Sequence, residues 1–363
     1  MKITIVAGAR PNFIKIAPII HALHGARKNG GDISCRLVHT GQHYDANMSA
    51  AFFEELRIPQ PDINLEVGSG SQAAQTAAIM TGFEKDLLDN KTDLVLVVGD
   101  VTSAMACAIA AKKLNIKVAH VEGGIRSFDL TMPEEINRMV TDSITDYFFT
   151  TSEFANNNLK KAGVEGHRIF FVGNTMIDTL LANMSRLKEP GVYKRLHLSD
   201  ANYFVLTLHR PANVDQESKL KLLMEAILKG ARGLPVVFPI HPRTAKIFAN
   251  LDVGSDNLHI IEPLGYLMFN YLVKRAKAVI TDSGGITEET TVMGVPCMTL
   301  RDNTERPETC EIGTNKLIGT DPGNIAPAMD LLFLGKWAKG KIPHLWDGKT
   351  SERIIECLLK LPL

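Results

Sequence analysis

Carboxylates in this sequence have the types and spacing needed for proton transfer at a bound substrate. Asp100 and Glu122 each follow an apolar run, and Glu134 opens a helical pattern with Arg138 four residues on. On a helix that spacing places Glu134 and Arg138 on one face. Carboxylates that share a crevice raise one another's pKa, which can provide one acid and one base near neutral pH. An ordinary surface ion pair is the alternative for Glu134 and Arg138.

A second set of residues is suited to binding phosphate. The segment Asp282-Ser283-Gly284-Gly285 follows an apolar run and opens a helical pattern. Backbone N–H groups at a helix N-terminus bind anions, and paired glycines let phosphate oxygens approach the main chain. The alternative is a tight strand-to-helix turn with Asp282 or Ser283 as a plain helix cap. Of the adjacent Glu288 and Glu289, one could accept hydrogen bonds from a ribose diol or could simply complement the helix dipole.

Cationic side chains stand at further points where a predicted strand ends. Arg10 and His209 each follow an apolar run, and Lys15 lies about one helical turn after Arg10. Arginine presents a planar fork that matches phosphate, while lysine acts as a point charge. Arg306 is a further phosphate candidate, and His209 could donate to a phosphate or move a proton. Surface charge and structural roles are the alternatives for these four residues.

Short apolar runs alternate with helical patterns almost from end to end of the chain. The predicted strands are 3–7, 35–39, 94–98, 118–121, 147–150, 169–172, 203–208, 235–240, 259–261, 278–281 and 296–300. Helical patterns of the first half lie near 12–24, 46–56, 72–89, 102–114, 134–145 and 153–162. This alternation predicts an α/β protein with parallel sheets covered by helices on both faces. Ligands bind outside the carboxyl ends of such strands, so the candidate groups could meet in one cleft.

The alternation weakens around residues 185–201, which suggests a domain boundary. We expect two Rossmann-like domains, an N-terminal one over 1–180 that carries the carboxylates and a C-terminal one over 181–349 that carries the Ser-Gly-Gly loop. The active site is expected in the cleft between them. The helical pattern in 350–363 follows a polar break and is expected to return to the first domain.

Composition narrows the possible partners. The 363 residues include 40 lysines and arginines and 40 aspartates and glutamates, so no overall charge attracts nucleic acid or anionic lipid. No apolar run approaches the roughly 20 residues of a bilayer span, and no secretory signal is expected at the N-terminus. The five cysteines are scattered without a Cys-x-x-Cys pair. Reduced thiols in a cytoplasmic protein are therefore expected, and a zinc site is not.

These motifs together resemble those of the non-hydrolysing UDP-N-acetylglucosamine 2-epimerases along essentially the whole chain. The resemblance is carried by the order and spacing of Gly8-Ala9-Arg10-Pro11, Thr40-Gly41-Gln42-His43, His120-Val121-Glu122-Gly123-Gly124-Ile125-Arg126, Pro133-Glu134-Glu135-Ile136-Asn137-Arg138, Ser283-Gly284-Gly285 and Thr304-Glu305-Arg306-Pro307-Glu308. It implies a GT-B architecture, a homodimer and no required metal or redox cofactor. It also implies a UDP-sugar substrate and a role in supplying a precursor for surface polysaccharide.

The reaction that the resemblance implies removes the proton at sugar carbon 2 as UDP leaves carbon 1. UDP then adds back to the resulting 2-acetamidoglucal, with protonation from the opposite face. Motif by motif, the resemblance gives acid/base roles to Asp100, Glu122 and Glu134. Contacts with the diphosphate are implied for Arg10, Lys15, His209, Ser283, Gly284, Gly285 and Arg306. Glu289 would bind the ribose diol, and Phe269 would lie beside the uracil.

Two departures from the commoner family motif leave other functions open. Asn12 stands where glutamate is commoner, and Arg210-Pro211-Ala212-Asn213 lacks the glutamate of Arg-x-Glu-Asn. An amide at Asn12 also resembles a branch that acts on UDP-2,3-diacetamido-2,3-dideoxyglucuronate, and fewer acids would suit an anionic sugar. A retaining glycosyltransferase of the same fold and a non-catalytic nucleotide-sugar sensor are the remaining alternatives.

Overall fold

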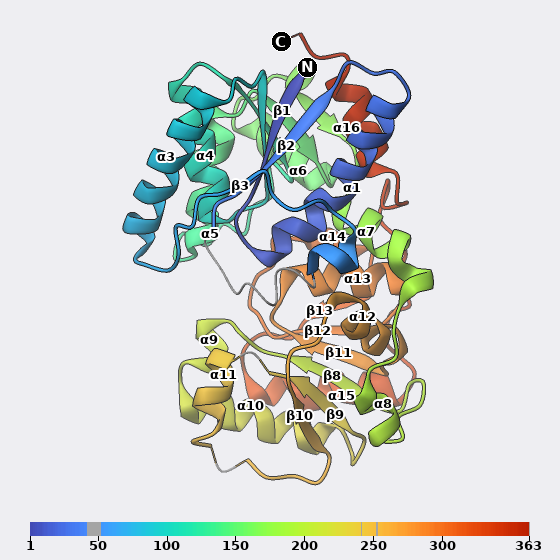
Figure 1. Cartoon of the computed structure of the whole chain (residues 1–363). Helices are drawn as coiled ribbons and strands as arrows, with labels where there is room; N and C mark the ends of the chain where they lie inside the picture. Colours follow the sequence, from blue (N-terminus) through green and yellow to red (C-terminus); the bar gives the residue numbers. More distant parts are fainter. Residues whose placement is uncertain (42–51, 241, 252, 363) are drawn as a thin grey trace. The chain divides into compact units, whose positions relative to one another are not determined.

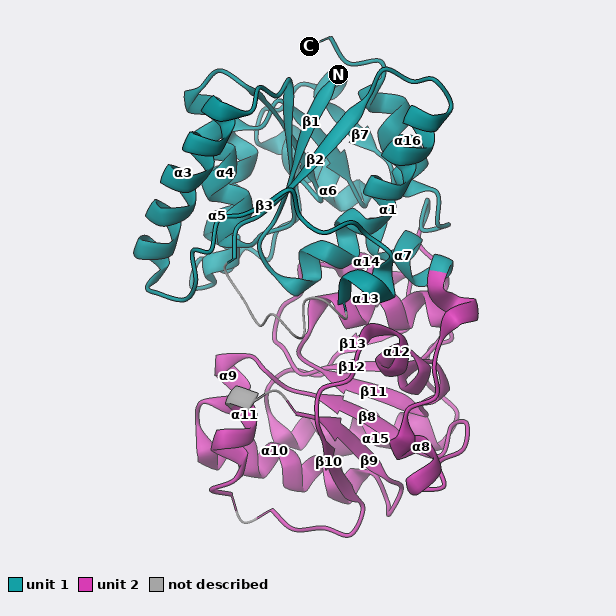
Figure 2. Ribbon diagram, in the orientation of Figure 1, with its two compact units in different colours: residues 1–182, 344–363 teal, residues 183–343 magenta. Residues whose placement is uncertain are grey.

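The computed structural model describes residues 1–41, 52–240, 242–251 and 253–362. The predicted helical pattern near 46–56 lies partly outside the described residues, and Gln42 and His43 lie wholly outside them. The chain divides into two compact units, Met1–Ala182 with His344–Leu363, and Asn183–Pro343 (Figure 2). Among the described residues, no helix has the length and apolar character needed to cross a membrane.

Unit 1 is built on a seven-stranded sheet with the strand order β3-β2-β1-β4-β5-β6-β7, in which all neighbours are parallel (Figure 1). Its strands are β1 (Lys2–Ala7), β2 (Ser34–His39), β3 (Ile63–Asn64), β4 (Leu94–Val98), β5 (Lys117–Val121), β6 (Tyr147–Thr150) and β7 (Ile169–Phe171). Its helices are α1 (Arg10–Lys28), α3 (Gln72–Asp89), α4 (Thr102–Lys113), α5 (Pro133–Ile144), α6 (Glu153–Lys161), α7 (Thr175–Asn183) and α16 (Thr350–Leu358). All five residues of β4 are buried, as expected for a central strand covered on both faces.

The C-terminal helix α16 packs against α1 within unit 1. Its apolar face is buried, and the side chain of Asp178 accepts hydrogen bonds from the N–H groups of Thr350 (3.0 Å) and Ser351 (2.7 Å). A carboxylate at this position satisfies first-turn donors and complements the helix dipole. Just before the helix, the indole of Trp346 donates to the Thr151 carbonyl at 3.0 Å, so the segment is held by both apolar and polar contacts.

Unit 2 contains a six-stranded parallel sheet with the order β10-β9-β8-β11-β12-β13. Its strands are β8 (Phe204–Thr207), β9 (Val236–Pro239), β10 (Leu258–Ile261), β11 (Ala278–Thr281), β12 (Cys297–Thr299) and β13 (Asn315–Leu317). Its helices are α8 (Gly191–Arg195), α9 (Pro211–Val214), α10 (Glu217–Gly230), α11 (Pro242–Phe248), α12 (Tyr266–Arg275), α13 (Gly284–Met293), α14 (Pro307–Glu311) and α15 (Ile325–Phe333).

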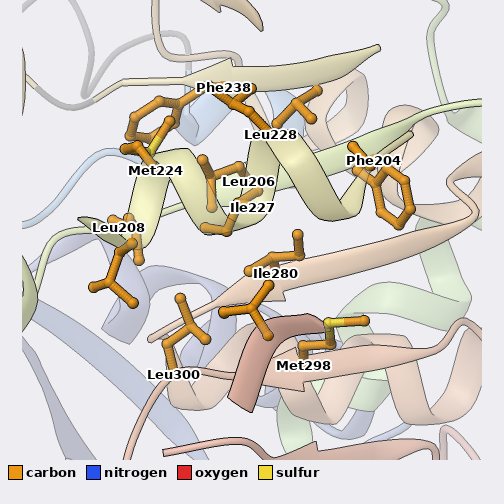
Figure 3. Packing of buried hydrophobic residues seen from close by; sticks show 14 of the residues in the cluster. Phe204, Leu206, Leu208, Met224, Ile227, Leu228, Phe238, Ile280, Met298 and Leu300 are labelled. Carbon is orange, nitrogen blue, oxygen red and sulfur yellow. The ribbon is translucent and has the colours of Figure 1, made fainter. Parts of the chain in front are cut away.

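Alternate residues of β8 are buried on opposite faces of this sheet. Phe204 and Leu206 pack with Met224 and Ile227 of α10 in one apolar cluster (Figure 3). Val205 lies in a second cluster on the other face. Full burial of each such side chain contributes about 1.5–3 kcal/mol to the stability of the fold. The predicted α/β class, with parallel sheets covered on both faces, is confirmed in each unit.

Both sheets reverse their strand order at one point, between β1 and β4 in unit 1 and between β8 and β11 in unit 2. Strands on the two sides of such a point connect in opposite directions, which opens a crevice at their carboxyl ends. The segments that leave these strands are 8–10 and 99–101 in unit 1, and 208–210 and 282–284 in unit 2. Five of the candidate functional residues therefore lie at a switch point, namely Arg10, Asp100, His209, Ser283 and Gly284.

Candidate functional site

The loop after β1 is held tightly against the end of β4. The Oδ1 atom of Asn12 accepts hydrogen bonds from the N–H groups of Gly8 (3.1 Å) and Ala9 (3.0 Å), and its Nδ2 donates to the Val98 carbonyl at 3.1 Å. A glutamate in place of Asn12 could accept from the same N–H groups but could not donate to Val98. The amide therefore connects the two loops of the switch point. Arg10 begins α1, and its guanidinium lies 5.1 Å from the centre of the Phe52 ring.

Lys15 and Glu122 form a buried ion pair at this switch point. Lys15 Nζ lies 2.7 Å from Glu122 Oε2, and both side chains are almost fully buried. Glu122 has a φ of 70°, which is unusual for a residue other than glycine. A Cβ atom on the facing Gly99 would lie 3.0 Å from Lys15 Nζ, so the chain leaves little free space around the pair. The left-handed backbone of Glu122 and the burial of two charges both reduce the stability of the folded protein. Such features tend to be kept where function requires them.

Asp100 belongs to a second charged cluster, organised by Arg138 of α5. Arg138 donates to Asp100 Oδ2 from Nη2 (2.8 Å) and Nε (3.1 Å), and it also donates to Glu135. Arg138 and Glu135 are buried, whereas the Asp100 side chain is 30% exposed. The Glu135 carboxylate also accepts from the N–H groups of Ser127 and Phe128. Asp100 is thus the carboxylate of this cluster that a ligand can reach.

Glu134 differs from its neighbour Glu135. It is partly exposed, and it makes no hydrogen bond or ion pair with any residue that the structure describes. The alternative of an ion pair between Glu134 and Arg138 is therefore wrong, because Arg138 turns to Asp100 and Glu135 instead. Glu135 is not among the partners predicted for Arg138, although its spacing of three is as compatible with a helix face as the spacing of four.

At the switch point of unit 2, Asp282 orients His209. The fully buried Asp282 carboxylate accepts from the N–H groups of His209 (3.1 Å) and Arg210 (2.9 Å), and its Oδ1 lies 2.8 Å from His209 Nδ1. Burial raises the pKa of Asp282, but the His209 and Arg210 contacts outweigh burial and leave that pKa lowered. The imidazole is half-exposed, and among the described residues only its Nδ1 is engaged. Nε2 therefore remains for a ligand.

The Ser283-Gly284-Gly285 segment begins α13 without a side-chain cap. Ser283 occupies the N-cap position but its hydroxyl makes no capping bond, and Asp282 points to the 209–210 loop instead. The alternative of a plain helix cap is therefore wrong for both residues. A Cβ atom on Gly284 would lie 2.6 Å from a carboxylate oxygen of Glu305, so any larger residue there would displace the end of the Glu305 side chain. The first-turn N–H groups of this helix suit an anion.

A cavity of about 220 Å³ adjoins His209 in unit 2. Its lining residues are Thr207, Leu208, His209, Pro239, Pro263, Leu264 and Phe269. The walls are mostly apolar, with one imidazole among them, a combination typical of small-molecule sites. The structure thus places His209 and Phe269, which are distant in sequence, at the same cavity.

The two adjacent glutamates of α13 have different partners. Glu288 pairs with Arg306, whose Nε lies 2.6 Å from Glu288 Oε1, and both side chains are buried. Glu289 accepts a hydrogen bond from the Tyr266 hydroxyl at 2.8 Å and lies 3.5 Å from Asn270 Nδ2. Burial raises the pKa of Glu289 to about 7, although the Tyr266 and Asn270 contacts oppose the rise. No pattern in the sequence predicted the two residues of α12 that hold Glu289.

The raised pKa of Glu289 predicts a pH dependence of stability. The folded protein favours the neutral form of Glu289. The contribution of this neutral carboxyl to the free energy of unfolding is fully present below about pH 4.5 and is lost as pH rises through about 7. Glu289→Gln cannot ionise, so at pH 8 we expect it to be more stable than the natural protein by up to about 3 kcal/mol. At pH 5 the difference should be small. Calorimetric unfolding at both pH values measures it.

The exposed Glu262 provides a matched control, since Glu262→Gln should shift Tm equally at both pH values. Parallel Tm curves for Glu289→Gln and the natural protein between pH 5 and pH 8 would show that Glu289 is ionised throughout and would contradict the assignment.

In the part of the chain that the structure describes, no group of three or more histidine, cysteine, aspartate or glutamate side chains could hold a metal ion. The five cysteines are free thiols. Burial raises the pKa of Cys107 and of Cys297, which keeps these thiols protonated and unreactive.

Comparison with known proteins gives consistent matches over nearly the whole chain. Residues 26–359 match the family model described as UDP-N-acetylglucosamine 2-epimerase. The UDP-N-acetylglucosamine 2-epimerase of Methanocaldococcus jannaschii is 44% identical over 369 residues, which cover 99% of each chain. The UDP-2,3-diacetamido-2,3-dideoxy-D-glucuronate 2-epimerase of Pseudomonas aeruginosa is 39% identical over 365 residues, 99% of this chain and 100% of that one.

Solved structures agree with these sequence matches. The crystal structure of the M. jannaschii UDP-GlcNAc 2-epimerase in complex with UDP-GlcNAc and UDP is similar to this chain with a TM-score of 0.89. The two are 42% identical, and the likeness covers 99% of each chain.

Proposed function

This chain belongs to the UDP-N-acetylglucosamine 2-epimerase family, and we propose that it interconverts UDP-N-acetylglucosamine and UDP-N-acetylmannosamine by inverting sugar carbon 2. The family match confirms the resemblance inferred from the motifs, and the similar solved structures confirm the fold class. Within the site, one observation carries the proposal. Asp100 and Glu122 follow the adjacent strands β4 and β5, and each is paired with a cation.

The proposed reaction is an elimination followed by an addition. A base removes the proton at carbon 2, and the electrons of that C–H bond form the C1=C2 double bond. The C1–O bond breaks, and its electrons leave with UDP. UDP then adds back to carbon 1 while an acid protonates carbon 2 from the opposite face. Because the proton leaves from one face of the sugar and returns to the other, the reaction requires more than one proton-transferring group. Asp100, Glu122 and Glu134 are the proposed groups.

The leaving diphosphate needs fixed positive charge and N–H donors, because charge develops on it as the C1–O bond breaks. We assign this role to the first turn of α13 (Ser283, Gly284 and Gly285), to His209 Nε2, and to Arg10, Lys15 and Arg306. In the 220 Å³ cavity of unit 2, Phe269 would lie beside the uracil. The Glu289 carboxyl, held by Tyr266, would bind the ribose diol.

A second substrate is supported by a specific observation. The P. aeruginosa relative acts, by its name, on a UDP-diacetamido-glucuronate, and its identity to this chain is nearly as high as that of the M. jannaschii relative. Asn12 also keeps an uncharged amide beside the Lys15–Glu122 pair. We therefore propose UDP-2,3-diacetamido-2,3-dideoxyglucuronate as the alternative substrate of the same reaction.

Incubation of the protein with each UDP-sugar alone, followed by NMR of the products, tests the proposal. Formation of UDP-N-acetylmannosamine from UDP-N-acetylglucosamine without an acceptor supports it. Turnover of the glucuronate alone would select the alternative substrate. Transfer only when an acceptor is added would indicate a glycosyltransferase, and binding without turnover would indicate a sensor.

We also propose that the protein works as a cytoplasmic homodimer that supplies a precursor for surface polysaccharide. The exposed side chains of Phe128, Leu130 and Met139 line a 590 Å³ groove on unit 1, and an apolar surface of this kind supports association of two copies.

A further inference from the structure

A buried polar network lies directly behind the loops that carry Asp100 and Glu122. Its central residue is His120 of β5, which is fully buried. His120 Nδ1 lies 2.7 Å from Asp142 Oδ1, and its Nε2 lies 2.9 Å from the carbonyl oxygen of Gly99. A carbonyl oxygen can only accept a hydrogen bond, so Nε2 must donate to Gly99.

Asp142 of α5 holds the other side of this imidazole. Its Oδ2 accepts from the N–H group of Gly124 at 3.0 Å and lies 2.6 Å from Arg126 Nη1. Burial raises the pKa of Asp142, but the contacts and charges of His120 and Arg126 outweigh burial and lower that pKa overall. Asp142 is therefore a carboxylate, and it fixes the ring of His120 as acidic partners of histidine commonly do.

The His120–Gly99 bond joins two loops whose positions matter for the proposed reaction. Gly99 directly precedes Asp100, and its N–H group donates to the carbonyl of Val121 at 3.0 Å. Val121 directly precedes Glu122, whose φ of 70° requires support from its surroundings. Gly99 is thus bound to β5 through both its N–H and its carbonyl group. These two bonds set the spacing between the main chains of Asp100 and Glu122.

We propose that His120 and Asp142 are positioning residues, which hold the two proton-transferring carboxylates at the spacing that the reaction requires. The inference rests on the proposed function and deepens it, since neither residue need contact the substrate. Misplacement of a reacting group by about 1 Å can cost about 100-fold in rate. Loss of the bond to Gly99 should therefore lower kcat, while binding of UDP through unit 2 should be preserved.

Two variants of His120 separate positioning from simple stability. In His120→Gln the amide nitrogen can reach the place of Nε2 and keep the bond to Gly99. In His120→Asn the shorter side chain can reach only the place of Nδ1, so the bond to Gly99 is lost. We expect His120→Asn to lower kcat by about 100-fold and His120→Gln by about 10-fold or less. The KM for the UDP-sugar and the Kd for UDP should change by less than about 3-fold in both.

The ion pair of the partly exposed Arg36 with the buried Asp86, which lies elsewhere in unit 1, provides the control. Asp86→Asn should lower Tm but leave kcat within about 3-fold. A kcat for His120→Asn that is close to the natural value, or equal losses in both His120 variants, would overturn the proposal. If His120→Asn does not fold, Asp142→Asn decides, since it leaves His120 in place. A loss of at least about 10-fold in kcat would support the proposal, and an unchanged kcat would contradict it.

Crystal structures of the two His120 variants give a readout that does not depend on activity. The Gly99–Asp100 main chain should move in His120→Asn and stay in place in His120→Gln. An unmoved main chain in His120→Asn would overturn the positioning role even if the natural protein turned over neither UDP-sugar. That lack of turnover would by itself contradict only the proposed function.

Discussion

Replacing Glu122 by glutamine is expected to lower kcat by at least about 100-fold while the affinity for UDP stays within about 3-fold. Glutamine keeps the volume of the side chain and can still accept from Lys15, which lies 2.7 Å away, but it cannot take up or release a proton. General acid–base groups contribute about 10²–10⁴-fold to rate. Steady-state kinetics of UDP-sugar interconversion and calorimetric titration with UDP measure the two quantities.

The same loss is expected for Asp100→Asn and Glu134→Gln, because each removes one proposed proton-transferring group. For the buried Glu122, the control for loss of a buried carboxylate is again Asp86→Asn, whose partner Arg36 lies in β2. A variant that retains near-normal turnover would remove its residue from the mechanism.

Replacing Arg138 by methionine is expected to lower the free energy of unfolding by about 3–5 kcal/mol. The guanidinium is almost fully buried and serves both Asp100 and Glu135. Methionine would leave the buried Glu135 carboxylate without its ion-pair partner, and loss of one member of a buried pair costs this much because a charge is left uncompensated. Urea unfolding of both proteins at pH 7 measures the difference.

The exposed pair of Arg232 and Asp330 provides the comparison, since both side chains are more than half exposed. Arg232→Met should cost less than about 1 kcal/mol, as exposed ion pairs contribute little. If Arg138→Met cost no more than Arg232→Met, the Arg138 cluster would not have the stabilising role that its burial implies.

The central strands of both sheets could be predicted from the sequence because they are continuous apolar runs. Two short edge strands, β3 and β13, were missed. They span two and three residues and each contains a polar asparagine, so no apolar run marks them. Their pairing depends on a neighbouring strand that is already in place, which is a tertiary effect.

The residues of the candidate site could be predicted where a polar or charged side chain comes directly after a strand. Asp100, Glu122 and His209 were found because each stands just beyond an apolar run in the sequence. His120 and Asp142 could not be found in this way, since they lie inside a strand and a helix and meet only through the packing of α5 near β5. Asn12 was noted only as a departure from a motif. Its role in joining Gly8, Ala9 and Val98 depends on the parallel neighbours β1 and β4.

The most direct test of the proposed reaction is the fate of the hydrogen at sugar carbon 2. When the protein acts on UDP-N-acetylglucosamine in deuterated water, the UDP-N-acetylmannosamine that forms should carry deuterium at carbon 2. The proton is expected to leave to a carboxylate and to be replaced by one from a carboxylic acid on the other face, and both groups exchange protons with solvent. Proton NMR and mass spectrometry of the product measure the incorporation. Product that retains the original hydrogen would contradict epimerisation by elimination and re-addition.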